Sequence, residues 1–276
     1  MKTRQNKTLA ALIVLASITG FSSCKKEQMN SLTKTKANLI GVDATYNEML
    51  RMTMSMGVSG SFKTEDADAI PGAIVTDDTL SNPHTRTIDY GSGCIDNYGK
   101  IYKGQIIISY TTRDFLHVAG ASVAITPVNY SVDDHDISGT TTLQNDGVNG
   151  NGNVTLTYNV NAKRVRIDNG AIDSLGGQQV VEWVAGSDTE DKSDDQLSFT
   201  GLLGGHSTQD GDFDFAINIL QPLIKNRAND CNEFFVKGET LTQVSGQSDV
   251  YLDYGDGTCD DLGVETIDGI STTITL

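Results

Sequence analysis

The strongest candidates for binding chemistry lie in the segment DYGDGTCDD, residues 253–261. Asp253, Asp256 and Asp260 alternate there with glycines, and calcium prefers several oxygen ligands on a sharply turning backbone. The spacing does not fit an EF-hand loop, which also ends in glutamate. A turn in which each carboxylate bonds nearby backbone amides explains the same residues. The segment therefore gives two alternatives, a calcium site and an Asx-rich turn, and no other cofactor is indicated.

Catalytic motifs are missing from the sequence. It contains no G-x-S-x-G, H-E-x-x-H, G-x-x-x-x-G-K or C-x-x-C. A pair of carboxylic acids for glycoside hydrolysis stays open, because such pairs meet only in the folded chain. Trp183 and the nine tyrosines could form a sugar-stacking platform, or they could pack in the interior and across strands. The sequence thus names no catalytic residue.

The N-terminus predicts lipidation. Lys2, Arg4 and Lys7 precede an apolar run that ends at Phe21, and Ser22-Ser23-Cys24 follows. Basic residues, a short apolar run and small residues at a cleavage point are typical of a secretory signal. The segment Phe21–Cys24 resembles the lipobox of bacterial lipoproteins. That resemblance implies a signal peptide over residues 1–23 and acylation of Cys24, for example with palmitate.

The other three cysteines are Cys94, Cys231 and Cys259. Thiols outside the cytoplasm tend to pair, and an odd set allows at most one bridge within the chain. A down-and-back path over two strands could return Cys259 to Cys231. Loop closure favours this shorter loop by only about 0.9 kcal/mol. We predict a Cys231–Cys259 disulfide, with Cys94 as a buried free thiol.

Composition limits the partners. The net charge is −16, and removal of residues 1–23 with their three basic residues brings it to −19. A strongly acidic surface repels nucleic acid, so we exclude nucleic-acid binding. Glycine is abundant (28) and proline scarce (4), and beyond the first 60 residues no apolar stripe of helical period is evident. These features favour an all-β protein with many tight turns.

The chain divides into four parts. After the signal peptide we expect a lipidated N-terminus and flexible tether over 24–42, a short helix or loose segment and loop over 43–86, and an all-β domain over 87–276. The helix would run from Asp43 to about Met56. An antiparallel meander of roughly ten to twelve strands, forming a sandwich or an open barrel, is the predicted fold. The expected strands are 72–76, 104–112, 121–132, 136–145, 154–160, 163–168, 178–185, 196–203, 213–220, 233–242, 248–254 and 264–275.

Two segments of this region echo each other, IDYGSGC at 88–94 and LDYGDGTC at 252–259. In each, aspartate can bond turn amides while the glycines allow positive φ. The lipobox, the IDYGSGC…KGQIIISYT segment and the closing DYGDGTCDD…ITL together resemble a group of Bacteroidota lipoproteins. The resemblance implies an all-β domain in the cell envelope and a location at the outer membrane, and it transfers no catalytic residue.

Two functions follow as hypotheses. The first is a lipid-anchored envelope protein, on the periplasmic or the surface face, that is not an enzyme and binds a glycan or a protein partner or has a structural role. The second is a hydrolase of envelope or dietary polysaccharide. Exposed aromatics along one sheet face would support glycan binding, and two carboxylates about 5–10 Å apart in a cleft would support the hydrolase.

Overall fold

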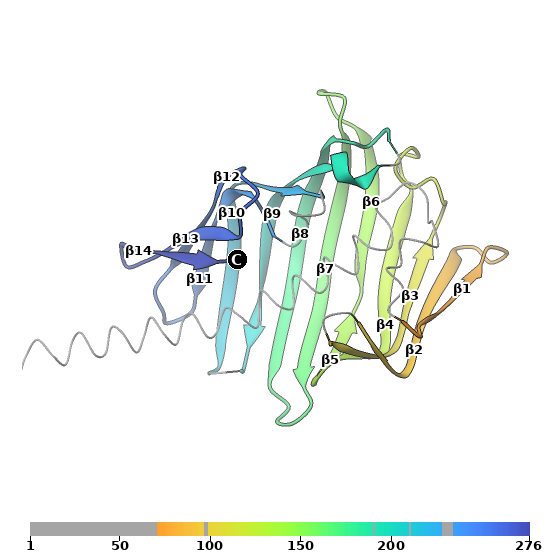
Figure 1. Ribbon diagram of the computed structural model, residues 1–276, viewed down its shortest axis with the longest axis horizontal. Helices are drawn as coiled ribbons and strands as arrows, with labels where there is room; N and C mark the ends of the chain where they lie inside the picture. Colours follow the sequence, from red (N-terminus) through yellow and green to blue (C-terminus); the bar gives the residue numbers. More distant parts are fainter. Residues whose placement is uncertain (1–70, 97–98, 190, 210, 228–233) are drawn as a thin grey trace, which may run out of the picture.

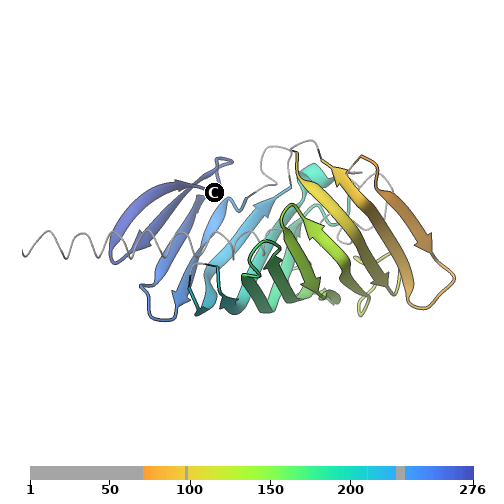
Figure 2. The ribbon, with the colours of Figure 1, turned by 90° about the horizontal axis from the view of Figure 1, so that it is seen from below.

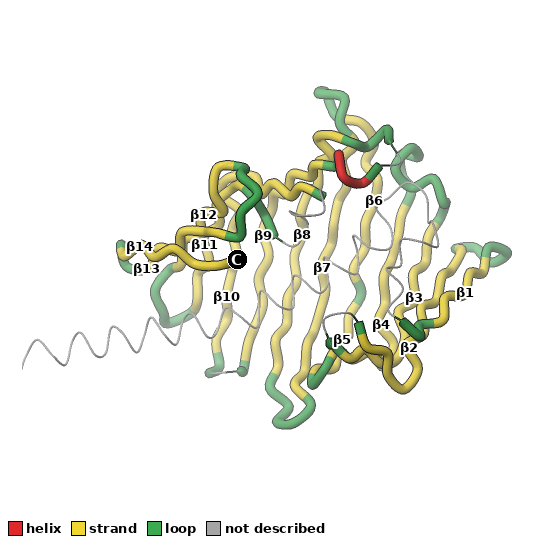
Figure 3. Tube along the Cα trace, in the orientation of Figure 1, coloured by secondary structure: helices red, strands yellow, loops and turns green. Residues whose placement is uncertain are grey.

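The computed structural model describes residues 71–96, 99–189, 191–209, 211–227 and 234–276. The predicted signal peptide, Cys24, the tether and the helix at 43–56 lie outside these residues, as does Cys231. Within the described ranges the chain is almost entirely β-structure (Figure 3), and its single helical element is the 3-10 turn η1 at Lys192–Asp194. The described part contains no helix long and apolar enough to cross a membrane.

Fourteen antiparallel strands form one sheet, which confirms the all-β antiparallel prediction (Figure 1). The strands are β1 (Ile74–Asp78), β2 (His84–Ile95), β3 (Ile101–Tyr110), β4 (Ser122–Val132), β5 (His135–Gly139), β6 (Thr141–Val148), β7 (Val154–Arg166), β8 (Ile172–Ala185), β9 (Gln196–Ser207), β10 (Phe213–Asn226), β11 (Lys237–Val244), β12 (Val250–Asp256), β13 (Leu262–Ile267) and β14 (Ile270–Thr275).

The order of the strands in the sheet follows their order in the chain. Only β6 departs from this path, because it pairs with β4 and β7 beside β5. Figure 2 shows the sheet bent into a trough, with β1–β4 in one wall and β9–β14 in the other. Strands β1 and β14 are the two edges and do not pair with each other. The architecture is therefore a single open sheet rather than the two packed sheets of a sandwich.

Most strands between the two edges have a buried face and a solvent face. In β7, Val154, Leu156, Tyr158 and Val160 are buried, while the threonines and asparagine between them are only partly covered. Successive side chains of a strand point to opposite faces, so this alternation produces a sheet with one packed and one solvated side. The buried face continues across the sheet through Ile106, Ile125 and Phe199, each 0% exposed.

Several strands are longer than the sequence pattern predicts. The expected segments 154–160 and 163–168 are one strand, β7, and β8 begins at Ile172 rather than at 178. The expected strand 136–145 is divided at Thr140 into β5 and β6, and 264–275 is divided into β13 and β14. The sheet also begins before residue 87, with β1 and the first residues of β2.

Glycine makes one close approach possible in the middle of the sheet. Gly205 of β9 lies opposite Leu175 of β8 and Phe215 of β10. A Cβ at this position would overlap the carbonyl oxygen of Ser174 and would lie 2.7 Å from Cζ of Phe215. The Phe215 ring therefore occupies the space that any other residue at 205 would need.

Candidate functional site

The repeated Asp-Tyr-Gly segments share one local structure. The backbone N–H of Gly91 donates to Oδ1 of Asp89 at 2.7 Å, and that of Gly255 donates to Oδ1 of Asp253 at 2.8 Å. Both glycines have positive φ, +56° and +98°, which residues with a Cβ rarely adopt. The first copy does not end its strand, because β2 continues through it to Ile95 with shifts of register.

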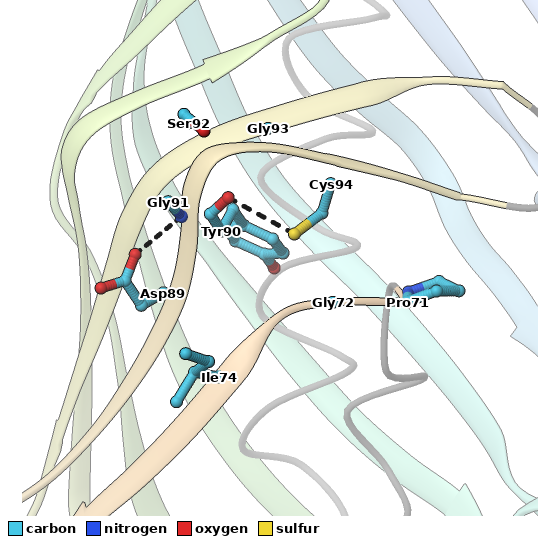
Figure 4. Close-up of a pocket in the computed structure, with 9 residues that line it drawn as sticks. All are labelled: Pro71, Gly72, Ile74, Asp89, Tyr90, Gly91, Ser92, Gly93 and Cys94. Carbon is cyan, nitrogen blue, oxygen red and sulfur yellow. Dashed lines mark hydrogen bonds between the residues drawn. The ribbon is translucent and has the colours of Figure 1, made fainter.

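The first copy lines an open pocket of about 310 Å³ (Figure 4). Of the described residues that line it, Asp89 is the one with a carboxylate, and Pro71, Gly72 and Ile74 close the opposite wall. Both oxygens of Asp89 are occupied, since Gln105 Nε2 donates to Oδ2 at 2.8 Å. The bonds from Gln105 and Gly91 lower the pKa of Asp89. Among the described residues that line the pocket there is no second acid to form, with Asp89, the carboxylate pair that glycoside hydrolysis needs.

Cys94 lies in the wall of the same pocket. Its thiol is free and 6% exposed, and Sγ donates to the carbonyl oxygen of Tyr90 at 3.3 Å. Tyr90 in turn packs against the rings of Tyr102 and Tyr130, with centroids 5.7 Å away in both cases. The thiol is thus part of the packed interior beneath the pocket.

The second copy contains the calcium candidates Asp253, Asp256 and Asp260. Each carboxylate accepts hydrogen bonds from groups two residues further along, which are Gly255, Thr258 and Leu262. Among the described residues no group of three or more His, Cys, Asp or Glu side chains is placed to hold a metal ion. The described contacts are those of Asx turns, and the calcium site stays a prediction.

Cys259 lies between the second and the third of these turns and is disulfide-bonded. Its partner lies outside the described residues, so the pairing with Cys231 also stays a prediction. Cys94 is excluded as the partner because its thiol is free.

A buried ionic cluster joins η1 to the end of β10. Asp195 accepts from Trp183 Nε1 at 3.1 Å through Oδ1 and from Arg227 Nη1 through Oδ2. Burial raises the pKa of Asp195 to about 6, and the Arg227 guanidinium opposes this rise. Asp195 and Trp183 are 5% and 2% exposed. The cluster has little access to solvent, so it belongs to the packed interior at this end of the sheet.

The aromatic residues do not form a sugar-stacking platform in the described part of the chain. Trp183 is buried, and so are five tyrosines: Tyr90, Tyr102, Tyr110, Tyr130 and Tyr158. Tyr251 on β12 is exposed and has no aromatic neighbour among its register partners, Leu241 and Thr266. The packing interpretation of the aromatic residues is therefore the correct one for these side chains.

The solvent face carries an unusual set of apolar side chains across β8–β13. We call Val180, Leu202, Leu241, Tyr251 and Val264 the apolar strip. Leu202, Asn218, Leu241 and Tyr251 are successive register partners on four neighbouring strands, and Val180 and Val264 extend this row diagonally at its two ends. Leu241 is half-buried, and the other four strip residues are 40–51% exposed. Neighbouring strands are ~4.8 Å apart, so the strip spans about 24 Å.

Polar and acidic groups border the strip. On the β7 side, Gln178 donates to Asn159, which donates to Thr142, at 2.9 and 3.3 Å. On the other side, Glu239 and Asp253 are direct register partners. Two carboxylates in facing positions of a sheet repel each other, so this border favours a cationic group on whatever covers it.

The strip was not predicted, although the sequence contains a signal for it. Val180-Val181 and Leu202-Leu203 are pairs of consecutive apolar residues within strands. Because neighbours in a strand face opposite sides, one member of each pair must point to solvent when the other enters the core.

A scan against protein-family models found no match for this chain, and searches of curated proteins and of solved structures found none either. The functional argument therefore depends on the residues and their geometry.

Proposed function

We propose that this chain is a lipid-anchored cell-envelope protein that binds a protein partner on the solvent face of β8–β13. The observation that carries the proposal is the apolar strip, because four of its side chains are 40–51% exposed and follow one row across the sheet that only Asn218 interrupts. Contiguous apolar groups rimmed by polar residues mark interaction surfaces in soluble domains. Their aliphatic character supports a protein partner, since sugars are bound by stacking on exposed aromatic rings.

Charge defines the partner further. The chain has a net charge of −16, and Glu239 and Asp253 face each other beside Tyr251 and Val264. A partner with apolar side chains at its centre and lysine or arginine at its rim matches this arrangement. Such rim charges increase the rate of association more than the affinity, and their effect falls with added salt.

The membrane anchor rests on the N-terminal pattern of Lys2, Arg4, the apolar run and Ser22-Ser23-Cys24. One acyl chain gives marginal membrane binding, and two or more give stable anchoring. Metabolic labelling with a fatty-acid analogue tests this part. We expect label on the natural chain and none on Cys24→Ala, and a Cys24→Ala chain that is labelled and stays with the membrane would refute it.

A photo-crosslinking amino acid tests the binding surface in intact cells. Placed at Leu202 it should give a discrete adduct with another protein, whereas at Asn161, an exposed position of β7 on the same solvent face, it should give none. Tyr251→Glu should abolish the Leu202 adduct, because it places a charge in the apolar row. Equal adducts at both positions, or a carbohydrate adduct at Leu202, would contradict the proposal.

A further inference from the structure

The two edges of the sheet differ in how they are protected. Strand β1, IVTDD, ends in two acids, and Asp77 forms a two-point ion pair with the buried Arg86 at 2.6 and 2.9 Å. Strand β14, ISTTIT, has no charged residue and no proline, and five of its six residues are exposed. Charges and prolines are the usual means by which edge strands avoid pairing with another chain. Only β1 has such protection.

The hairpin before β14 determines which backbone groups are free. Asp268 and Gly269 both have positive φ, +52° and +75°, in a two-residue turn closed by Ile267 and Ile270. This pair and every second pair after it exchange hydrogen bonds. Asp261 and Leu276 continue that alternation, and Leu276 N donates to Asp261 O at 2.7 Å. Ser271, Thr273 and Thr275 therefore direct their N–H and C=O groups away from β13. No described strand pairs with that side.

We propose that β14 pairs with β14 of a second copy of this chain, antiparallel, around a two-fold axis at Thr273. In this register Thr273 faces Thr273 of the other copy and Ser271 faces Thr275. The three facing pairs exchange about six backbone hydrogen bonds, and they consist of hydroxyl side chains, which are favourable cross-strand partners.

The lack of charge on β14 allows two copies of this acidic chain to meet at this edge. The chain is strongly acidic, so most faces of two copies repel each other, but the paired segment itself is neutral. Acids approach only at the ends, where Asp268 of one copy lies towards Asp260 and Asp261 of the other. Screening of these groups should strengthen the dimer as salt is added.

The assembly closes at two copies. A two-fold interface uses the same strand on both partners and leaves no second β14 edge for further growth. The remaining edges of the dimer are the two β1 strands with their acids. We therefore expect a dimer with one sheet running through both copies and no longer polymer.

A cysteine at the axis gives a direct test. Facing residues of a hydrogen-bonded pair have Cα atoms ~5.5 Å apart, a separation that a disulfide accommodates. With copper phenanthroline as oxidant, full-length Thr273→Cys protein in mild detergent should form a covalent dimer. Thr76→Cys, at an exposed position of the β1 edge, should not. Equal cross-linking of the two variants would overturn the proposal.

Sedimentation velocity of the full-length chain gives the second measurement. The natural chain should form a reversible dimer that strengthens with salt. Thr273→Lys, which places two positive charges at the axis, should raise the dissociation constant at least tenfold. No described residue bonds the N–H or C=O of Thr273, so this variant should unfold at the same denaturant concentration as the natural chain. A natural chain that stays monomeric, or a dimer insensitive to Thr273→Lys, would also refute the pairing.

Discussion

Arg227 Nη1 lies 3.0 Å from Oδ2 of Asp195, and the two side chains are 11% and 4% exposed. The residues are 32 positions apart, and the pairing of Gln196 with Asn226 brings them together. The backbone repeats the contact, since Arg227 N donates to Asp195 O at 3.0 Å. Burial of Asp195, which Arg227 offsets only in part, makes the stability of the protein depend on pH in a defined direction.

The first prediction concerns that dependence. The pKa of Asp195 is about 6 in the folded chain, compared with 3.8 for an aspartate in water. Between these values the folded state holds a proton that the unfolded state has released. The contribution of Asp195 to stability is therefore complete below pH ~4 and is lost as pH rises through 6, by about 1–3 kcal/mol.

Urea unfolding of the natural chain and of Asp195→Asn, followed by the fluorescence of Trp183, tests this dependence. The difference in unfolding free energy between the two chains should change by this amount between pH ~4 and a pH above 6. A difference independent of pH would contradict the prediction.

The second prediction concerns Arg227, the ion-pair partner of Asp195. Arg227→Met leaves Asp195 as an uncompensated buried charge, which costs about 3–5 kcal/mol of unfolding free energy at pH 7. The loss should shrink at pH 5, where Asp195 takes up a proton instead. Lys163→Met, at an exposed position of β7, is the matched control and should change stability by less than about 0.5 kcal/mol. An equal loss at both pH values would show that Asp195 is not the group involved.

The third prediction concerns Gly205. An added methyl group must displace the Ser174 backbone or the Phe215 ring, so Gly205→Ala should lower the unfolding free energy by about 2–3 kcal/mol. Gly150→Ala adds the same methyl group where no atom lies within 4 Å, and it should be close to neutral. Denaturant midpoints of the two variants measure the contrast. Comparable midpoints would mean that the sheet relaxes around Gly205 at little cost.

The fourth prediction concerns the thiols. Non-reducing peptide mapping should yield a cross-linked peptide that contains Cys231 and Cys259. A bridge over a loop of this size stabilises a chain by about 3–4 kcal/mol in the chain-entropy model. Cys94 should react with an alkylating reagent only after unfolding, because it is buried. A cross-linked peptide with Cys24 in place of Cys231 would show the predicted pairing to be wrong.

The sequence predicts the class of fold because alternation is strong in strands such as β7, where apolar residues occupy every second position. It predicts strand ends less well. Gly176 and Gly177 suggest a turn before 178, yet β8 continues through both. Conversely, Asp268-Gly269 is a strong hairpin signal within the expected strand 264–275, and the structure has the hairpin turn there.

Some features of the candidate sites could also be predicted from the sequence, and others could not. Local features such as the Asp-Tyr-Gly turns could be predicted, because Asp89 and Gly91 are neighbours whose hydrogen bond needs no tertiary contact. The apolar strip and the Asp195–Arg227 pair could not. Each is formed by residues from different strands, and their proximity depends on a register that no local pattern specifies.

The near agreement between chain order and strand order has a consequence for folding. Each new strand, apart from the β5–β6 detour, needs only the strand made before it as a template, so the sheet can grow in the direction of synthesis with short loops to close. A growing sheet of this kind always has one unsatisfied edge, which the next strand covers as it is made. Among the described strands β14 is the edge that is reached last, and it is the edge without charged residues.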